Sequence, residues 1–574
     1  MKKYLIRLLP TVLLISFMSA CAVQSKDDAP AYEKFRYNQE GYFTKGPKLA
    51  LVSEDVDELV IKDEAGKEVL RAAAALPLFW DASGDAVRKV DFSELDSAGT
   101  YIVEPSGSDE KYKILIADNP FEELGKSVIK AFYYNRSSIP LEEKYAGKWA
   151  REAGHPDTLV LVHSSAADAN RPEGTIISSP LGWYDAGDYN KYVVNSAITN
   201  YTLLRALSDY PEYYAALELN IPESGNGVPE LLSEILFNLR WFISMQDDYD
   251  GGVYHKLTTK KFEEFVMPHE AVNQRFVVAK STAATLDYAA LTAAASRVLR
   301  KYEDLLPGLA DTCLIRSEKA WNWTLANPEI YYQQPADIAT GAYGDDMLDD
   351  EWFWAASELY LATGDDKYRE VIKMKYDAPT VPTWGDVRTL GFYSLLDNYD
   401  SIAVIAQSLP LEDEFMALAD KLTLASQTSA YGLSIQKFEW GSNSSVANEG
   451  VIKLFAYKMT GDTKYLNSAV SDLDFILGRN ATGYCFVTGF GVNQVMNIHH
   501  RPSAADGILE PVPGFLVGGP NLAVLDDCGA DIERSPFPAK SYVDLECSYS
   551  TNEIAINWNA PMVYLVGAIN ARMR

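Results

Sequence analysis

Basic residues, cysteine and histidine are all scarce in this chain of 574 residues. There are 51 Lys and Arg against 80 Asp and Glu, which gives a net charge of −29. A chain this acidic repels nucleic acid and anionic lipid, and it suits an uncharged partner. Only six His and five Cys are present. They form no Cys-x-x-Cys pair and none of the Cys/His spacings of a structural zinc site.

Long apolar runs are also missing beyond the first segment, where three basic residues precede an apolar run over 8–18. That run is too short to span a bilayer as a mature helix. It ends in Ser19-Ala20-Cys21, and small residues directly before a Cys are typical of a bacterial lipoprotein signal; the alternative is an ordinary signal peptide. We expect residues 1–21 to be the signal and 22–30 a tether. The protein would then lie in the bacterial cell envelope, on its periplasmic or outer face, touching the membrane only through a lipid on Cys21.

The other four cysteines leave the disulfide question open. An exported chain permits disulfides. Cys528–Cys547 is a conceivable pair, and four free thiols, including Cys313 and Cys485, are equally compatible with the sequence.

Residues 31–117 have the pattern of a small β-sandwich. Short apolar runs at 48–52, 58–61, 90–92, 100–103 and 111–116 are separated by turn residues such as Asp63-Glu64-Ala65-Gly66. Short strands spaced by turns favour an all-β module. Nothing in this part resembles a catalytic constellation.

From residue 118 the apolar period becomes helical, and we expect 118–574 to form one all-α domain. The segment 360–368 is echoed by 457–465, each with Thr-Gly-Asp at its centre. Each Gly is placed to end a helix in the left-handed conformation, and each Asp is placed to cap the next helix. Repeated helical hairpins over such a length predict a closed ring of hairpins.

Two carboxylates flank the tight turn Asp185-Ala186-Gly187-Asp188. Carboxylates this close raise one another's pKa, and together they are able to hold and deprotonate a water molecule. The competing interpretation is that these residues merely cap the helix that follows.

A third carboxylate, Glu553, is surrounded in the sequence by apolar residues and lies near Asp544. A general acid for a glycosidic oxygen needs a raised pKa, which an apolar site and a neighbouring carboxylate supply. A buried glutamate paired with Lys or Arg is the alternative. Between the two segments, His499-His500-Arg501 offers donors for sugar hydroxyls.

These segments together resemble glycoside hydrolase family 9, the inverting cellulases. Asp185-Ala-Gly-Asp188 matches the base motif, Thr488 to Arg501 the first family signature, and Tyr542 to Ala560 the second. Ile498 and Cys485 depart from the usual Pro and Ser of the first signature. Asn38-Gln39-Glu40-Gly41-Tyr42 resembles the start of the immunoglobulin-like module that precedes some family 9 domains.

The resemblance implies a multi-domain protein, a small all-β immunoglobulin-like sandwich followed by an all-α (α/α)6 barrel. It assigns Asp188 as base, Asp185 as its partner on the water, Glu553 as acid and Asp544 as a residue near the acid. It places His499 and Arg501 on a β-1,4-linked glucan, the expected partner, and makes Trp183, Tyr184, Trp354, Trp384, Trp440 and Trp558 candidate sugar contacts.

No cofactor is expected for the chemistry, because protein carboxylates suffice. The resemblance allows a structural Ca²⁺, for which the acidic run Asp345, Asp346, Asp349, Asp350 and Glu351, with Asp386, offers oxygen ligands. A solvated acidic loop is the alternative. Two other functions also stay open. One is an exo-acting cellodextrinase or glucosaminidase on the same barrel, and the other is a non-catalytic glycan-binding lipoprotein.

Overall fold

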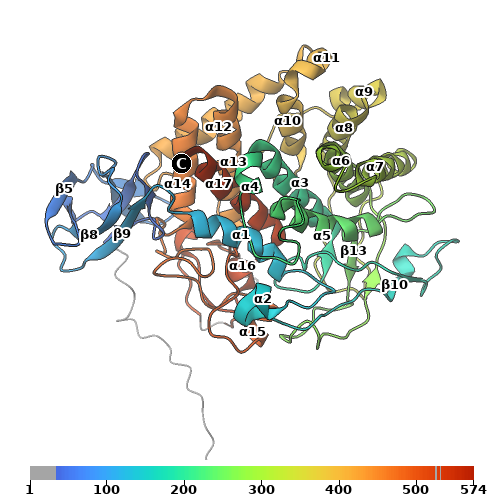
Figure 1. Cartoon of the computed structure of the whole chain (residues 1–574), viewed down its shortest axis with the longest axis horizontal. Coiled ribbons are helices and arrows are strands. Elements are labelled where there is room, and N and C mark those ends of the chain that lie inside the picture. Colours follow the sequence, from blue (N-terminus) through green and yellow to red (C-terminus); the bar gives the residue numbers. More distant parts are fainter. Residues whose placement is uncertain (1–33, 524–525, 530–531, 574) are drawn as a thin grey trace, which may run out of the picture.

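The computed structural model describes residues 34–523, 526–529 and 532–573. Figure 1 shows a small β-domain at one side of a larger, mostly helical body. The predicted fold class, an immunoglobulin-like sandwich followed by a helical barrel, is therefore confirmed.

The β-domain consists of two facing sheets. One has the order β1-β3-β7-β6 and the other β2-β9-β8-β4-β5. A continuous apolar core lies between them, including Phe35, Leu59 and Val103. The strands extend the predicted runs by a few residues and add short ones that no clear alternation announced: β1 (Phe35–Arg36), β2 (Tyr42–Phe43), β3 (Leu49–Ser53), β4 (Glu58–Lys62), β5 (Glu68–Ala73), β6 (Leu78–Trp80), β7 (Asp85–Asp91), β8 (Gly99–Pro105) and β9 (Tyr112–Ala117).

Twelve helices of the larger domain alternate along the chain between an outer and an inner position. The inner helices are α3 (Val193–Asp209), α6 (Thr282–Leu299), α8 (Asp349–Thr363), α10 (Arg388–Asp397), α13 (Ser442–Thr460) and α17 (Ile556–Met573), and most of their residues are buried. Each follows an outer helix, in order α1 (Glu122–Tyr134), α5 (Glu230–Ser244), α7 (Leu309–Ala326), α9 (Asp366–Met374), α12 (Leu411–Thr428) and α14 (Thr463–Ile476).

The inner helices close into a ring. Helix α17 packs on α3, α3 on α6, α6 on α8, α8 on α10, and α13 on α17. The Tyr393 and Phe455 rings, 4.9 Å apart, join α10 to α13. Six hairpins around a closed ring form the (α/α)6 barrel.

The repeated Thr-Gly-Asp motif acts as predicted. Gly364 and Gly461 end α8 and α13 with φ of 70° and 71°. Asp365 and Asp462 then cap α9 and α14, each accepting a hydrogen bond from the backbone N–H two residues on. Left-handed glycine caps followed by N-capping aspartates are favoured whatever the tertiary context, so local sequence sufficed here.

Long connections at one end of the barrel carry short elements and the candidate site. They include the sheet β11-β10-β14-β13-β12, built from β10 (Val160–Val162), β11 (Ile176–Ile177), β12 (Lys191–Tyr192), β13 (Lys256–Thr258) and β14 (Phe276–Val277). The remaining short helices are α2 (Glu143–Ala146), α4 (Pro211–Ala215), α11 (Ala403–Ala406), α15 (Arg501–Ala505) and α16 (Tyr549–Asn552). Single-turn 3₁₀ helices span Gly147–Trp149, Ser164–Ala166, Arg300–Tyr302, Tyr399–Ile402 and Pro538–Lys540.

The sandwich packs on the barrel through its start and through β6. The Trp80 ring lies 4.5 Å from that of Tyr431, so this tryptophan belongs to the domain interface. The side chains of Gln39 and Glu40 accept hydrogen bonds from the backbone N–H groups of Asn493 and Gly491. The Asn38-Gln39-Glu40 motif therefore anchors the loop that leads to His499.

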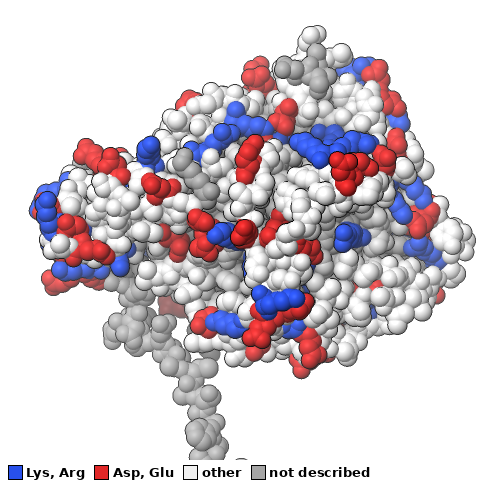
Figure 2. Space-filling view, in the orientation of Figure 1, with Lys and Arg blue, Asp and Glu red and all other residues white. Residues whose placement is uncertain are grey.

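Charged groups of both signs are interspersed on the face shown in Figure 2. Among the described residues, none of the helices is long and apolar enough for a bilayer span. The predicted signal peptide and tether, with Cys21, lie outside the described residues. Lipid anchoring in the cell envelope therefore stays a prediction, which fractionation of a Cys21→Ser variant would test.

Candidate active site

Backbone hydrogen bonds join the turn at 185–188 to the segment that carries Glu553. Ile556 N–H donates to Asp185 O at 2.8 Å, and Ala186 bridges Ala555. Glu553 Oε1 accepts a hydrogen bond from Gly187 N–H at 3.3 Å. A Cβ on Gly187 would lie 2.3 Å from His499 O, so this close approach requires glycine.

Asp188 is held on one side only. Its Oδ2 accepts hydrogen bonds from Tyr192 Oη at 2.9 Å and from Asn190 Nδ2 at 2.5 Å. Its Oδ1 is buried and has no hydrogen-bond partner among the described residues, although the side chain lines the cleft. A buried carboxylate oxygen without a partner needs a ligand or water, so Oδ1 suits a nucleophilic water.

Asp185 lies behind Asp188 and is fully buried. Asn195 Nδ2 donates to both of its oxygens at 3.0 Å, and Tyr343 Oη donates to Oδ2 at 3.2 Å. Burial and the nearby charge of Asp188 raise the pKa of Asp185 well above its ordinary value. The Asp185 carboxyl is therefore harder to ionise than an exposed aspartate.

Glu553 has the properties of an acid that is protonated at neutral pH. Burial, and then the charge of Asp188, raise its pKa to about 8, and Arg501 opposes this only in part. Lys and Arg form no ion pair with Glu553 in the described part of the chain. The alternative of a glutamate neutralised by a direct cation is therefore wrong.

His499 and Arg501 both line the cleft. His499 Nδ1 lies 2.8 Å from Glu546 O and donates to it in the neutral tautomer, which leaves Nε2 as an acceptor. Arg501 Nε and Nη1 donate to Glu263 O and Gly187 O, each at 2.7 Å. Arg501 thus holds the turn at 185–188 against the loop that carries Glu263. Its contact with a sugar stays a prediction.

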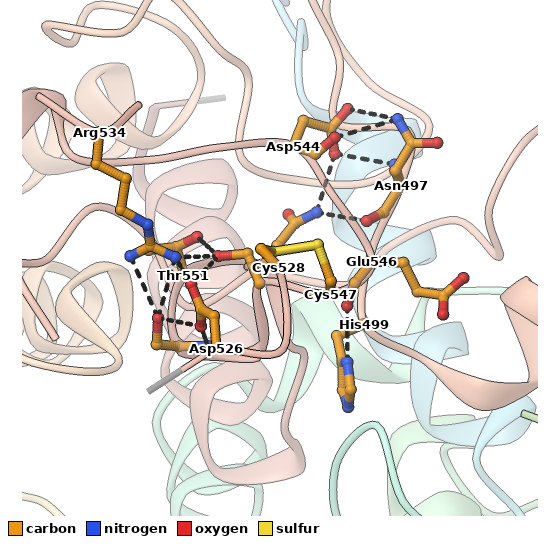
Figure 3. The surroundings of a disulfide bond; sticks show 12 residues. Asn497, His499, Asp526, Cys528, Arg534, Asp544, Glu546, Cys547 and Thr551 are labelled. Carbon is orange, nitrogen blue, oxygen red and sulfur yellow. Dashed lines mark hydrogen bonds and ion pairs between the residues drawn. A yellow bond between two sulfur atoms is a disulfide. The ribbon is translucent and has the colours of Figure 1, made fainter. Parts of the chain in front are cut away.

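Asp544 is a positioning residue. Its carboxylate accepts hydrogen bonds from the Met496 and Asn497 N–H groups at 2.8 and 2.9 Å and from Asn552 Nδ2 at 3.0 Å (Figure 3). It is not among the residues that line the cleft. The prediction that Asp544 belongs to the catalytic set is therefore corrected: it fastens the segment before His499 to the residue before Glu553.

The bridge Cys528–Cys547 is formed, while Cys313 and Cys485 are free and buried. Figure 3 shows the bridge between the Asp544 contacts and those of Arg534 with Asp526. Asp527, next to Cys528, lines the cleft. Glu546, next to Cys547, holds His499 through its backbone oxygen. The disulfide therefore ties the two loops that border this side of the site.

Most of the predicted aromatic contacts face elsewhere. Trp183 and Trp354 are fully buried and pack on Phe132 and Tyr201. Tyr184 is also buried, with its hydroxyl 2.8 Å from His155 Nδ1. These three predictions are wrong, because barrel packing turns the rings into the core.

The other tryptophans differ in place. Trp440 lines the cleft and is 41 % exposed. Trp384 packs on the Tyr343 ring at 5.1 Å, and Trp558 packs close to Gly441 and Gly518. Only Trp440 of the predicted tryptophans reaches the cleft surface.

The structure adds aromatic residues that sequence analysis missed. Phe262 and Phe265 lie on the 259–275 connection between β13 and β14 and line the cleft with Tyr192 and Tyr343. The segment Lys-Lys-Phe-Glu-Glu-Phe matches none of the motifs considered. The alternation of charged residues and Phe in this loop is only a weak indication of a substrate contact.

The acidic run lies at the start of α8, beside a second buried aspartate that the sequence did not indicate. Asp350 and Glu351 are buried, and Asp287 on α6 is fully buried with both oxygens unpartnered. Burial and the charges of Asp350 and Asp345 raise the pKa of Asp287 well above its ordinary value. Asp386 caps a nearby turn, and Asp346 is exposed.

These carboxylates offer the oxygen ligands that a hard cation such as Ca²⁺ prefers, and calcium binding by them stays a prediction. In the described residues, Lys and Arg form no ion pairs with Asp287, Asp345, Asp350, Glu351 or Asp386, and oxygens of Asp345 and Glu351 also lack partners. A second acidic group, Asp168, Asp247 and Asp250, already has the Lys280 ammonium at its centre. The first group is thus the better candidate, and Asp346 is its least suitable member.

Calcium is therefore expected to stabilise the fold. Saturating Ca²⁺ at about 100 times its Kd should add about 2.7 kcal/mol to the free energy of unfolding. Thermal denaturation of chelated and Ca²⁺-loaded protein measures this. Asp287→Asn and Glu351→Gln should lose most of the response, whereas Asp168→Asn should keep it. A chelated protein that melts like the loaded one would refute the site.

A closed helical barrel with a proton-bearing glutamate and a buried aspartate pair in one cleft defines a class, the acid–base glycoside hydrolases. Residues 121–566 match the model of "Glycosyl hydrolase family 9", and residues 31–110 match "Cellulase N-terminal ig-like domain". The chain belongs to glycoside hydrolase family 9 and is an inverting glycosidase.

Three relatives illustrate the similarity. The chain is 44 % identical to the xyloglucan-specific endo-beta-1,4-glucanase BoGH9A of Bacteroides ovatus, over 94 % of each chain. A solved Bacteroides ovatus family 9 structure superposes with a TM-score of 0.87 at 42 % identity, covering 94 % of this chain and all of that one. The structure of AaCel9A with cellobiose-like isofagomine superposes with a TM-score of 0.85 at 29 % identity, covering 94 % of this chain and 99 % of that one.

Proposed function

We propose that this protein is an endo-β-1,4-glucanase that cleaves xyloglucan-type chains, with Asp188 as base and Glu553 as acid. The observation that carries the proposal is the pairing, in one cleft, of a glutamate whose pKa is about 8 with an aspartate oxygen that has no hydrogen-bond partner in the described part of the chain. The first carries a proton at neutral pH, and the second is placed to accept one from a water molecule in the cleft.

The reaction follows from these two groups. Asp188 removes a proton from water as the water oxygen bonds to the anomeric carbon. The bond from that carbon to the glycosidic oxygen breaks, and Glu553 donates its proton to the departing oxygen. Because the water attacks opposite the leaving group, the anomeric configuration inverts. Asp185 and Asn190 orient the base and take no part in bond changes.

The cleft supports a glucan substrate through a row of rings. Phe265 lies 5.2 Å from His499, His499 lies 5.6 Å from Tyr549, and Tyr549 lies 5.7 Å from Trp440, measured between ring centroids. All four line one cavity of about 520 Å³. Two of the three pairs meet edge to face, so the row offers both ring edges and ring faces to the cavity. An aromatic face that is open to the cavity stacks on the apolar face of a glucosyl unit.

The choice of xyloglucan rests on the relative of 44 % identity. Hydrolysis of xyloglucan, mixed-linkage glucan, carboxymethyl-cellulose and cellohexaose at equal enzyme concentration tests it. We expect the highest kcat/KM on xyloglucan and a rapid early fall in polymer viscosity. Release of only short end products, or a preference for cellohexaose, would instead favour the exo-acting cellodextrinase.

Trp440→Ala should lower kcat/KM on polymer about tenfold, the equivalent of one lost aromatic stacking contact. Most of the effect should be in KM, because Trp440 is remote from the reacting atoms. Phe79→Ala on strand β6 is the matched control, since this ring is 63 % exposed and lies outside the cleft. An equal loss of kcat/KM in Phe79→Ala would indicate that the sandwich, and not the cleft, binds the polymer.

A further inference from the structure

Lys256 on β13 is a fully buried lysine with no acidic ion-pair partner. Its Nζ donates to Gln334 Oε1 and Thr340 Oγ1, both at 3.0 Å, and to Gly341 O. Three other lysines of the described residues are fully buried. Lys191 and Lys453 pair directly with Asp157 and Asp472, whereas Lys48 in the sandwich donates to the backbone oxygens of Thr44 and Gly46. An ammonium buried among neutral oxygens is costly, so its retention needs a reason.

The position of Lys256 close to Asp188 offers an explanation for the buried charge. Strand β13 pairs with β12, and Lys256 lies opposite Tyr192 in that pairing. The Lys256 ammonium lies 5.5 Å from the centre of the Tyr192 ring, and the Tyr192 hydroxyl donates to Asp188. A cation at the ring polarises the phenol toward donation, which favours an ionised carboxylate on the far side.

A chain of hydrogen bonds also leads from Lys256 to the base. Thr340 Oγ1, which accepts from Lys256, lies 2.7 Å from Thr258 Oγ1. The Thr258 hydroxyl shares its proton between Asn190 Oδ1 at 3.1 Å and Thr259 O at 2.8 Å. The same Asn190 oxygen accepts from Thr259 N–H at 3.0 Å. The Asn190 amide is thereby oriented with its NH₂ group on Asp188.

Lys256 further fixes the segment that supports Asp185. It bonds to Gly341 O, while His255 Nε2 donates to Ala342 O at 2.9 Å. The next residue, Tyr343, has a φ of +50° and donates to Asp185. A bulky residue in the left-handed region is strained, and such strain persists only where neighbouring contacts impose it.

We propose that Lys256 is a positioning residue that keeps Asp188, rather than Asp185 or Glu553, the ionised member of the three carboxylates. This inference rests on the proposed role of Asp188 as base. The titratable and charged groups that face Asp188 are Asp185 and Tyr192 from its own segment, Lys256 from β13, Tyr343, Glu553, and His499 with Arg501.

The effect should be greatest in acid. Burial lowers the pKa of Lys256 to about 7, and the charge of Asp188 opposes that shift. The ammonium is therefore present below about pH 7. A cation there delays protonation, and the acidic limb of the pH–rate profile lies lower than it would without Lys256.

The test is Lys256→Gln, which keeps a donor for the same oxygens and removes the charge. We expect the acidic limb of kcat/KM to move to higher pH by about one unit, so that activity on the acidic side falls more than activity at pH 8. Thr340→Val leaves the charge and cuts the hydrogen-bond chain. It should lower kcat without moving the limb.

A folded Lys256→Gln enzyme with the wild-type acidic limb would overturn the proposal. Lys256→Met serves if Gln does not fold. If neither folds, the ¹⁵N signal of the Lys256 amine in the wild-type enzyme decides, since a neutral amine at pH 5 to 6 is incompatible with the proposal. If the Lys256 variants keep the wild-type limb while Asp188→Asn is inactive, the role of Lys256 is wrong and Asp188 remains the base. If Asp188→Asn is active, the assignment of Asp188 as base is itself wrong.

Discussion

Glu553→Gln should lose about 10²–10⁴-fold in kcat on polysaccharide, because the glutamine cannot donate a proton to the glycosidic oxygen. Its loss on an aryl cellobioside with an acidic leaving group such as dinitrophenolate should be far smaller. That leaving group departs as a stable anion and needs little protonation. Steady-state kinetics on the two substrates, with the fold checked by circular dichroism and thermal melting, measure the contrast.

The same carboxyl sets the basic limb of the wild-type profile. The pKa of Glu553 is raised to about 8, so the acid is protonated below that pH and activity falls as the pH rises through about 8. Glu546→Gln is the matched control, because Glu546 is exposed and contributes its backbone oxygen to His499. A Glu553→Gln enzyme with near-wild-type rates on polymer would rule out its role as acid.

Asp188→Asn should lose about 10²–10⁴-fold on both kinds of substrate, since water must be activated whichever group leaves. This dependence on substrate separates the base from the acid. The variant should also shift the basic limb of its residual activity to lower pH. The charge of Asp188 raises the pKa of Glu553, so removing that charge lets the acid lose its proton earlier.

Asp506→Asn, a substitution outside the cleft beside α15, should leave both the rate and the limb unchanged. Proton NMR of the first products of the wild-type enzyme adds an independent observation, because inversion releases the α-anomer. An initial β-anomer would contradict the assignment of Asp188 to water, even if its variant were inactive.

Much of the site was predictable because its chemistry depends on residues close in sequence. Asp185 and Asp188 flank one turn, and the caps at Gly364 and Gly461 obey local rules of helix ending. Glu553 was predicted from its apolar neighbours, and the structure places it on the base turn through the bridge between Ala186 and Ala555.

The direction of side chains across the barrel was not predictable. Trp183 adjoins the base turn in sequence but packs on Phe132, while Phe262 and Phe265 reach the cleft from a distant loop. Which way a ring points is decided by the elements packed against its backbone, and these are remote in sequence. The same holds for Asp544, which supports the acid's segment without entering the cleft.

Local sequence indicates the two domains and the hairpin repeat, because composition, apolar period and turns act over a few residues. The three carboxylates of the site are identified through the resemblance to family 9. Which charged groups interact with one another follows from the tertiary fold. It buried Asp287 beside Asp350, gave Asp188 one unpartnered oxygen and placed the Lys256 ammonium near it. Burial and distance set these interactions, and both arise only when helices and loops far apart in the chain close around one cleft.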